Sequence, residues 1–235
     1  MNTLHLLLWL EGPLQSWGVN AKFSRRTTLD FPSRSAVLGL LCAALGAGGE
    51  QKEFLARLAK LPQTVVAYTR KDKQGRSVPA LQLCDFHMVG SGYDDKDPWQ
   101  TLHIPKTSEQ KPASNVIGNK LTYRYYLQDA AFAVALALPE TSQKELKEAL
   151  VSPRWDISLG RKCCVPTEFV YQGIYDSMDA AVRRAEEMGQ EKQFQELFRV
   201  LDGAHEGEQL ILPDVPLQFG PNKLYGERLV TVMAT

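Results

Sequence analysis

An excess of charge of either sign is missing from this chain of 235 residues. It carries 27 lysines and arginines against 27 aspartates and glutamates, so its formal net charge is zero at pH 7. A protein that binds nucleic acid on its own usually has a clear basic excess. If this chain binds nucleic acid, its basic residues must therefore be concentrated in a few places.

Cysteine is scarce, and no apolar run is long enough to span a membrane. None of the four cysteines are spaced as CxxC, which argues against a metal site and favours buried, reduced thiols (Cys42, Cys84, Cys163 and Cys164). The apolar run at residues 4–10 lacks the basic start and the small-residue cleavage site of a secretory signal. We therefore expect a cytoplasmic protein with no cofactor, no metal and no membrane contact.

Two segments are locally basic. Between Lys22 and Arg34, four basic residues face one acid, Asp30. Between His103 and Gln128, four basic residues again face one acid, with Lys106, Lys111, Lys120 and Arg124 against Glu109. Each segment is a candidate for binding phosphates, and each could instead be an ordinary solvated face.

The opening of the chain combines an apolar strand with a glycine-containing loop. Residues 4–10 read LHLLLWL, and residues 12–18 read GPLQSWG. Glycines let the backbone approach a ligand closely, and Trp17 offers a ring on which a base can stack, unless it packs on the core. Ser33 can begin a helix that Gly46 ends, and the free amides at such a helix start could bind a phosphate.

The hydrophobic pattern predicts an α+β fold. Strands are expected at 3–11, 64–70, 78–89, 120–128, 131–138, 210–212 and 228–233, with a short strand region starting at 159–164. Helices are expected at 33–46, 51–61, 142–151, 178–188 and 191–201. Residues 90–119 show no periodicity, and such a long loop in a compact domain is usually functional or disordered. This order favours an antiparallel sheet with helices on one face.

Further candidate contacts lie on the strand at 120–128 and in a turn at 160–162. Alternation along the strand places Tyr123 and Tyr125 on one face and Arg124 on the other. Aromatic side chains on such a sheet can stack bases, although tyrosine is also common in strands for packing reasons. Arg161 and Lys162 follow a glycine and could contact phosphates.

Several motifs in order resemble one protein family. They are GPLQSWG at 12–18, FPSRSAVLGLL at 31–41, DFH at 85–87, YLQDAAF at 126–132, LGRKCC at 159–164 and PLQF at 216–219. Together they resemble the CasD-type subunits of type I-E CRISPR Cascade complexes, which belong to the RAMP superfamily. The resemblance covers nearly the full length of the chain.

This resemblance implies an RRM-like (ferredoxin-like) domain at 1–139, with a thumb hairpin inserted at about 90–119, and a smaller C-terminal subdomain at 140–235. It implies a non-catalytic subunit of an antiviral ribonucleoprotein complex, which grips the 5′ handle of CRISPR RNA and caps the backbone. The implied partners are a CasC-type backbone subunit and a CasA-type large subunit. We expect the RNA to contact Trp17, Lys22, Arg25, Arg26, Ser33, Arg34, His87, Lys106, Lys120, Tyr123, Arg124, Arg161 and Lys162.

Two other functions remain open from the sequence. Type I-C relatives cleave RNA without a metal, using a Tyr, Lys and His set, and His87 could serve as a general acid or base. Here the comparable strand reads Tyr123-Arg124-Tyr125, with no histidine. The alternative is therefore a metal-independent endoribonuclease that processes CRISPR repeat RNA. A protein–protein adaptor that does not touch RNA is the third possibility, because the net charge is zero.

Overall fold

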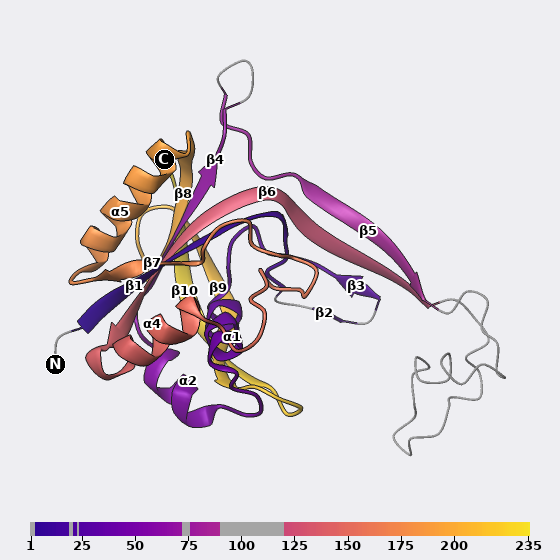
Figure 1. The fold of residues 1–235 in the computed structure, drawn as a ribbon. Coiled ribbons are helices and arrows are strands. Elements are labelled where there is room, and N and C mark those ends of the chain that lie inside the picture. The colour runs from indigo at the N-terminus through magenta and orange to yellow at the C-terminus, as the bar shows by residue number, and fades with distance from the viewer. Residues whose placement is uncertain (1–2, 19–20, 23, 72–75, 90–119) are drawn as a thin grey trace.

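The computed structural model describes residues 3–18, 21–22, 24–71, 76–89 and 120–235 (Figure 1). The expected thumb at 90–119, with Lys106, lies outside the described residues. The side chains of Lys22 and Lys120 also lie outside them. Of the helices that the structure describes, none is long and apolar enough to cross a membrane.

The described strands form one ten-stranded sheet, in which β6 is the central member. The strands are β1 (Thr3–Gln15), β2 (Ala21–Lys22), β3 (Arg25–Arg26), β4 (Gln63–Thr69), β5 (Gln82–Val89), β6 (Lys120–Pro139), β7 (Tyr171–Tyr175), β8 (Gln195–Asp202), β9 (Glu208–Gln218) and β10 (Leu224–Ala234). Along the sheet their order is β2-β3-β6-β4-β8-β10-β9, while β1 and β5 also pair with β6, and β7 pairs with β1. The pairing of β3 with β6 is parallel and the others are antiparallel, so the predicted antiparallel sheet is largely confirmed.

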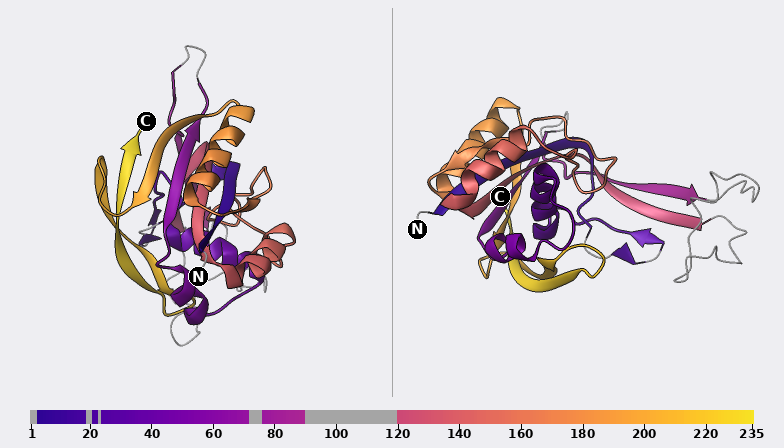
Figure 2. Two further views of the ribbon diagram at one scale, coloured as in Figure 1. Left: turned by 90° about the vertical axis from the view of Figure 1, so that its left-hand side faces the viewer. Right: turned by 60° about the horizontal axis from the view of Figure 1, so that its bottom comes forward.

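Helices cover both faces of this sheet, whereas the sequence pattern favoured one face. They are α1 (Arg34–Leu45), α2 (Lys52–Leu58), the 3-10 turn η1 (Glu140–Ser142), α4 (Gln143–Val151) and α5 (Met178–Glu191). In β1, Leu6, Leu8 and Leu10 pack in the cluster that includes α1, α2 and α4, whereas Leu7 and Trp9 pack with α5 (Figures 1 and 2). A strand that is apolar at nearly every position has to be covered on both sides.

Helix α1 follows the sequence signals closely. The Ser33 hydroxyl accepts a hydrogen bond from the Ala36 amide at 3.3 Å, as an N-cap does. Gly46 ends the helix in the left-handed conformation at φ 67°, where glycine carries no steric penalty. The predicted helix from Ser33 to Gly46 is confirmed to within one residue at each end.

Two local predictions are wrong. The helix expected at 191–201 does not form: α5 ends at Glu191 and the chain leads into β8, although Phe194, Leu197, Phe198 and Leu201 have helical spacing. Pairing with β4 on one side and β10 on the other outweighs this local pattern. The expected strand region at 159–164 is a turn, and the nearby strand is β7 instead.

The C-terminal strands extend the same sheet. The expected domain boundary at residue 139 coincides with the end of β6. Beyond it, however, β8 pairs with β4, from Val200 opposite Val65 to Gln195 opposite Thr69. The two halves of the chain therefore share one hydrogen-bonded sheet.

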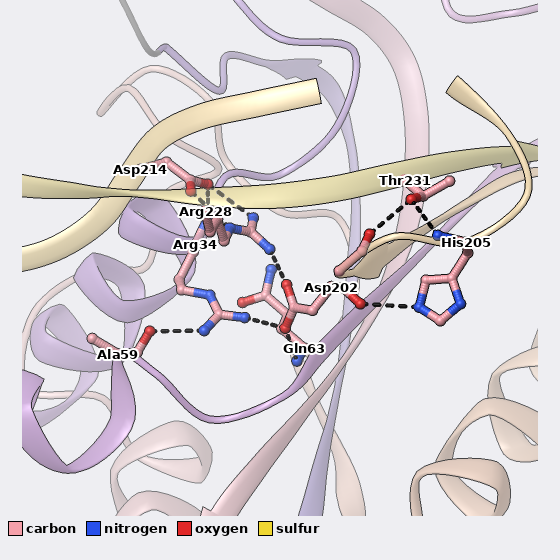
Figure 3. Close-up of polar contacts among 9 residues, drawn as sticks. Arg34, Ala59, Gln63, Asp202, His205, Asp214, Arg228 and Thr231 are labelled. Carbon is pink, nitrogen blue, oxygen red and sulfur yellow. Dashed lines mark hydrogen bonds and ion pairs between the residues drawn. The ribbon is translucent and has the colours of Figure 1, made fainter. Parts of the chain in front are cut away.

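A buried group of charges ties α1 to the C-terminal strands (Figure 3). Arg34 is only 3% exposed, and its guanidinium donates to the Ala59 carbonyl at 2.7 Å and to the carboxylate of Asp202. Its backbone amide donates to Asp214 at 2.7 Å. Arg228 completes the group, which we call the buried charge network (Arg34, Asp202, Asp214 and Arg228), because it donates to both carboxylates.

Charge pairing in this network offsets the cost of burial. Burial lowers the pKa of Arg34, while the adjacent Asp202 acts to raise it. Burial also acts to lower the pKa of Arg228, but the hydrogen bonds and charge of Asp214 and Asp202 raise it overall. Both guanidinium groups remain charged, and each depends on its carboxylate partners for stability.

We expect the substitution Arg34→Ala to destabilise the fold strongly, because it removes a buried guanidinium from the Ala59 carbonyl and leaves Arg228 as the one cation of the network for two carboxylates. The loss should be about 3–5 kcal/mol of the free energy of unfolding. Urea denaturation followed by circular dichroism measures it. The exposed Arg57→Ala on α2 serves as the control and should unfold like the parent chain; an equal loss in both variants would contradict a structural role for the network.

Candidate nucleic-acid interface

A two-stranded ribbon carries four of the predicted RNA-binding residues, His87, Lys120, Tyr123 and Arg124. β5 pairs with the first half of β6, from Gln82 opposite Leu127 to Val89 opposite Lys120. Figure 1 shows this ribbon extending away from the helices, whereas the second half of β6 lies in the core between β1 and β4. One strand therefore joins the buried sheet to the projecting ribbon.

The two locally basic segments meet on this ribbon. β3 pairs in parallel with β6, so that Arg25 lies opposite Tyr123 and Arg26 opposite Arg124. The backbone amide of Tyr123 also donates to the carbonyl of Ser24 at 2.7 Å. Residues about 100 positions apart in the sequence are thus neighbours in the sheet.

One face of the ribbon is aromatic. Phe86 and Tyr123 are directly opposite each other, with ring centroids 5.4 Å apart, and they are 55% and 41% exposed. Next to them, Arg25 donates to the Tyr125 hydroxyl at 3.0 Å, and its guanidinium lies 5.6 Å from the centre of that ring. This hydrogen bond raises the pKa of Arg25. Exposed rings beside a cation are suited to stacking and phosphate contact.

The opposite face carries arginines over a tyrosine. The guanidinium of Arg161 lies 4.5 Å from the centre of the Tyr126 ring and donates to the Arg26 carbonyl at 2.9 Å. Cys163 lies 3.6 Å from the Tyr126 hydroxyl. Nη1 of Arg161 and Nε of Arg124 have no hydrogen-bond partner within the described part of the chain. Both atoms are buried, so they are not open to solvent in this structure.

A close backbone approach holds Arg161 in place. The Ser16 amide donates to the Leu159 carbonyl at 3.0 Å, which docks the turn against the end of β1. Gly160 has φ 97°, and a Cβ at this position would overlap the carbonyl oxygen of Ser16. Only glycine fits here without moving the backbone, so the turn delivers Arg161 to the ribbon at a fixed position.

Three predicted residues lie away from this surface. Trp17 is fully buried, and its indole nitrogen donates to Gln15 at 3.1 Å, so it packs on the core, as the alternative interpretation held. Ser33 is fully buried and caps α1, and Arg34 belongs to the buried charge network. The prediction of RNA contacts at Trp17, Ser33 and Arg34 does not fit this structure, because all three side chains are buried and hydrogen-bonded to other parts of the chain.

The remaining described candidates lie on or beside the ribbon. Arg25, Arg26, Tyr123 and Arg124 lie on β3 and β6, His87 on β5, and Arg161 and Lys162 on the adjoining turn. His87 is 3.9 Å from Asp85, which is opposite Arg124. The sequence prediction missed Phe86 and Tyr126. The signal for Phe86 is its alternation along β5, but only the strand register shows that it faces Tyr123.

A metal centre has no evident ligands within residues 3–18, 21–22, 24–71, 76–89 and 120–235. No group of three or more His, Cys, Asp or Glu side chains there could hold an ion. The ribbon can instead offer guanidinium donors and aromatic rings, which are the groups that bind phosphates and bases.

Known proteins resemble this chain in sequence and in fold. The family model of the CRISPR-associated protein Cas5 matches residues 5–231. The Cascade subunit CasD of Escherichia coli strain K12 is 33% identical over 178 residues, which cover 74% of this chain and 73% of that protein.

Solved structures agree with these matches. A chain of a CRISPR RNA-guided surveillance complex is 26% identical, covers 98% of this chain and 90% of its own length, and has a TM-score of 0.72. A Cas protein crystal structure with 23% identity and a TM-score of 0.58, covering 98% and 94%, shares the fold. The chain therefore belongs to the Cas5 family of CRISPR-associated proteins and is similar to CasD of type I-E Cascade, as its motifs predicted.

Proposed function

We propose that this chain is a non-catalytic, cytoplasmic subunit of a type I CRISPR surveillance complex, and that it holds the 5′ handle of CRISPR RNA on the β5–β6 ribbon. In this role it caps a backbone of CasC-type subunits and lies beside a CasA-type large subunit. The similarity to CasD and to a surveillance-complex chain supports membership of such a complex. The observation that carries RNA binding is the pairing of β3 with β6, which gathers cations from distant segments on one ribbon.

The two faces of the ribbon make different kinds of contact with RNA. Arg26, Arg124 and Arg161 contact phosphates, which gives affinity without reading sequence. Phe86 and Tyr123 stack on unpaired bases, and Arg25 bridges the two kinds of contact. Because the chain has no net charge, binding depends on this local concentration and weakens with salt.

Replacing Arg25, Arg26 and Arg124 together by Ala should weaken binding of CRISPR RNA and flatten its salt dependence. Each lost phosphate contact lowers the slope of log K against log salt by about 0.7 for single strands, or roughly 2 for three contacts. Fluorescence anisotropy at several salt concentrations measures both quantities. Replacing the exposed Arg57, Lys60 and Arg183 by Ala removes the same charge elsewhere, and equal slopes in the two triple variants would count against the ribbon.

Stacking should respond differently from charge. We expect Phe86→Ala and Tyr123→Ala each to reduce affinity by about 1–3 kcal/mol per stacked base, with the salt slope unchanged. The same anisotropy titration tests this expectation. Phe169→Ala removes another exposed ring, 87% accessible and outside the ribbon, and should bind normally. Binding unaltered in all three variants would leave the aromatic face without a role in RNA recognition.

The chain should not cleave RNA. The purified protein, incubated with CRISPR repeat RNA in EDTA, should leave the RNA intact on a denaturing gel. His87 has Asp85 nearby at 3.9 Å and could assist proton transfer, so it is the residue on which the alternative depends. Cleavage that His87→Ala abolishes would establish the metal-independent endoribonuclease instead.

A further inference from the structure

A pocket of about 650 Å³ opens beside the body of the sheet, and none of the ribbon arginines lines it. Its floor and sides come from the end of β1, the end of β4, the link from β4 to β5, the middle of β6 and the residue before β8. The apolar walls are Pro13, Val78, Pro79, Leu81 and Phe194. This volume lies within the range of about 300–1,000 Å³ that is usual for binding pockets.

The pocket leaves apolar surface exposed to water. Leu81 is 66% exposed and Val78 is 40% exposed, and both line it. The amide of Gln128 donates to the Leu81 carbonyl at 2.8 Å, so the backbone at Leu81 is fixed to β6. Exposed apolar side chains that surround a hollow are typical of protein interaction sites.

Most charges at the pocket already have partners. The carboxylate of Glu11 accepts from the Trp9 indole at 2.8 Å and lies 3.4 Å from Lys192 and 3.9 Å from Arg70. Lys192 also pairs with Glu168 at 2.7 Å. Arg70 lies over the ring of Phe194, 4.6 Å from its centre. The two cations are therefore engaged.

Asp129 is the exception among the lining charges. Its side chain is exposed, and it has no hydrogen bond or ion pair with any residue that the structure describes. It also has φ 49° in the middle of β6, while its neighbours Gln128 and Ala130 stay in register with Leu14 and Gly12. Left-handed backbone inside a strand costs free energy, and such strain gathers at functional positions.

We propose that this pocket docks a loop of a neighbouring protein subunit, which carries an arginine or lysine next to an apolar side chain. The cation pairs with Asp129, and the apolar side chain covers Leu81 and Val78. Among the residues that line the pocket, the one charge without a described partner is negative, so it favours a basic protein segment over RNA phosphates. This protein contact is separate from the proposed RNA contacts. It rests on the proposed function only in assuming that the chain works within a multisubunit complex.

Photocrosslinking identifies the occupant directly. Leu81 is replaced by p-benzoylphenylalanine, and the whole complex is assembled from purified subunits with CRISPR RNA, irradiated and analysed by mass spectrometry. A crosslinked peptide from another subunit that contains arginine or lysine is the expected result. A crosslink to RNA or to a second copy of this chain, or none to another subunit, would overturn the proposal.

Asp129→Asn tests the charge separately. Asparagine tolerates the left-handed backbone as aspartate does, so the substitution removes charge with little change in shape. The share of this chain that co-purifies with the tagged complex should fall roughly tenfold, with a similar fall for Leu81→Ser. The exposed Asp156→Asn should assemble normally. Normal assembly of both pocket variants would refute the docking site.

RNA affinity separates this proposal from the RNA-binding proposal. Asp129→Asn should bind CRISPR RNA as the parent does, while the variant that lacks Arg25, Arg26 and Arg124 should not. If the parent chain fails to bind RNA but Asp129→Asn still impairs assembly, the ribbon role falls and the pocket role stands. If Asp129→Asn weakens RNA binding as much as assembly, the pocket is part of the RNA site and the docking proposal fails.

Discussion

The hydrogen-bond ladders of β6 are the constraint on which the rest of the structure depends. In its second half the strand lies between β1 and β4, where its apolar side chains are buried on both faces. In its first half it pairs with β5 and β3 and carries Tyr123 and Arg124. Because one continuous strand runs from the core into the ribbon, packing in the core fixes the position of the basic and aromatic side chains on the ribbon.

The buried charge network connects the second half of the chain to the first. Asp202 and Asp214 come from β8 and β9, and they accept hydrogen bonds from Arg34 at the start of α1. Apolar packing tolerates small shifts, whereas paired buried ions require one geometry. The network therefore fixes how α1 meets the C-terminal strands, and none of its residues lies on the β5–β6 ribbon.

Sequence reasoning succeeded where the signal was local. The apolar run of β1 and the capped helix α1 could be predicted because their determinants lie within a few residues. It failed where the partner is remote: Arg34 resembles a surface cation until Asp202, 168 residues away, is known to face it. For the same reason Phe86 was missed, since its contact with Tyr123 is visible only in the strand register. The segment of β8 was assigned to a helix because its apolar residues have helical spacing.

Gly160 shows how an absent side chain can set the position of its neighbour. The space that a Cβ would need is occupied by the carbonyl of Ser16, and the following residue is Arg161, which is held over Tyr126. Any larger residue would push the turn outward and carry the guanidinium away from the ribbon. Substitution at position 160 is thus limited by steric exclusion, although this residue has no side chain of its own with which to bind anything.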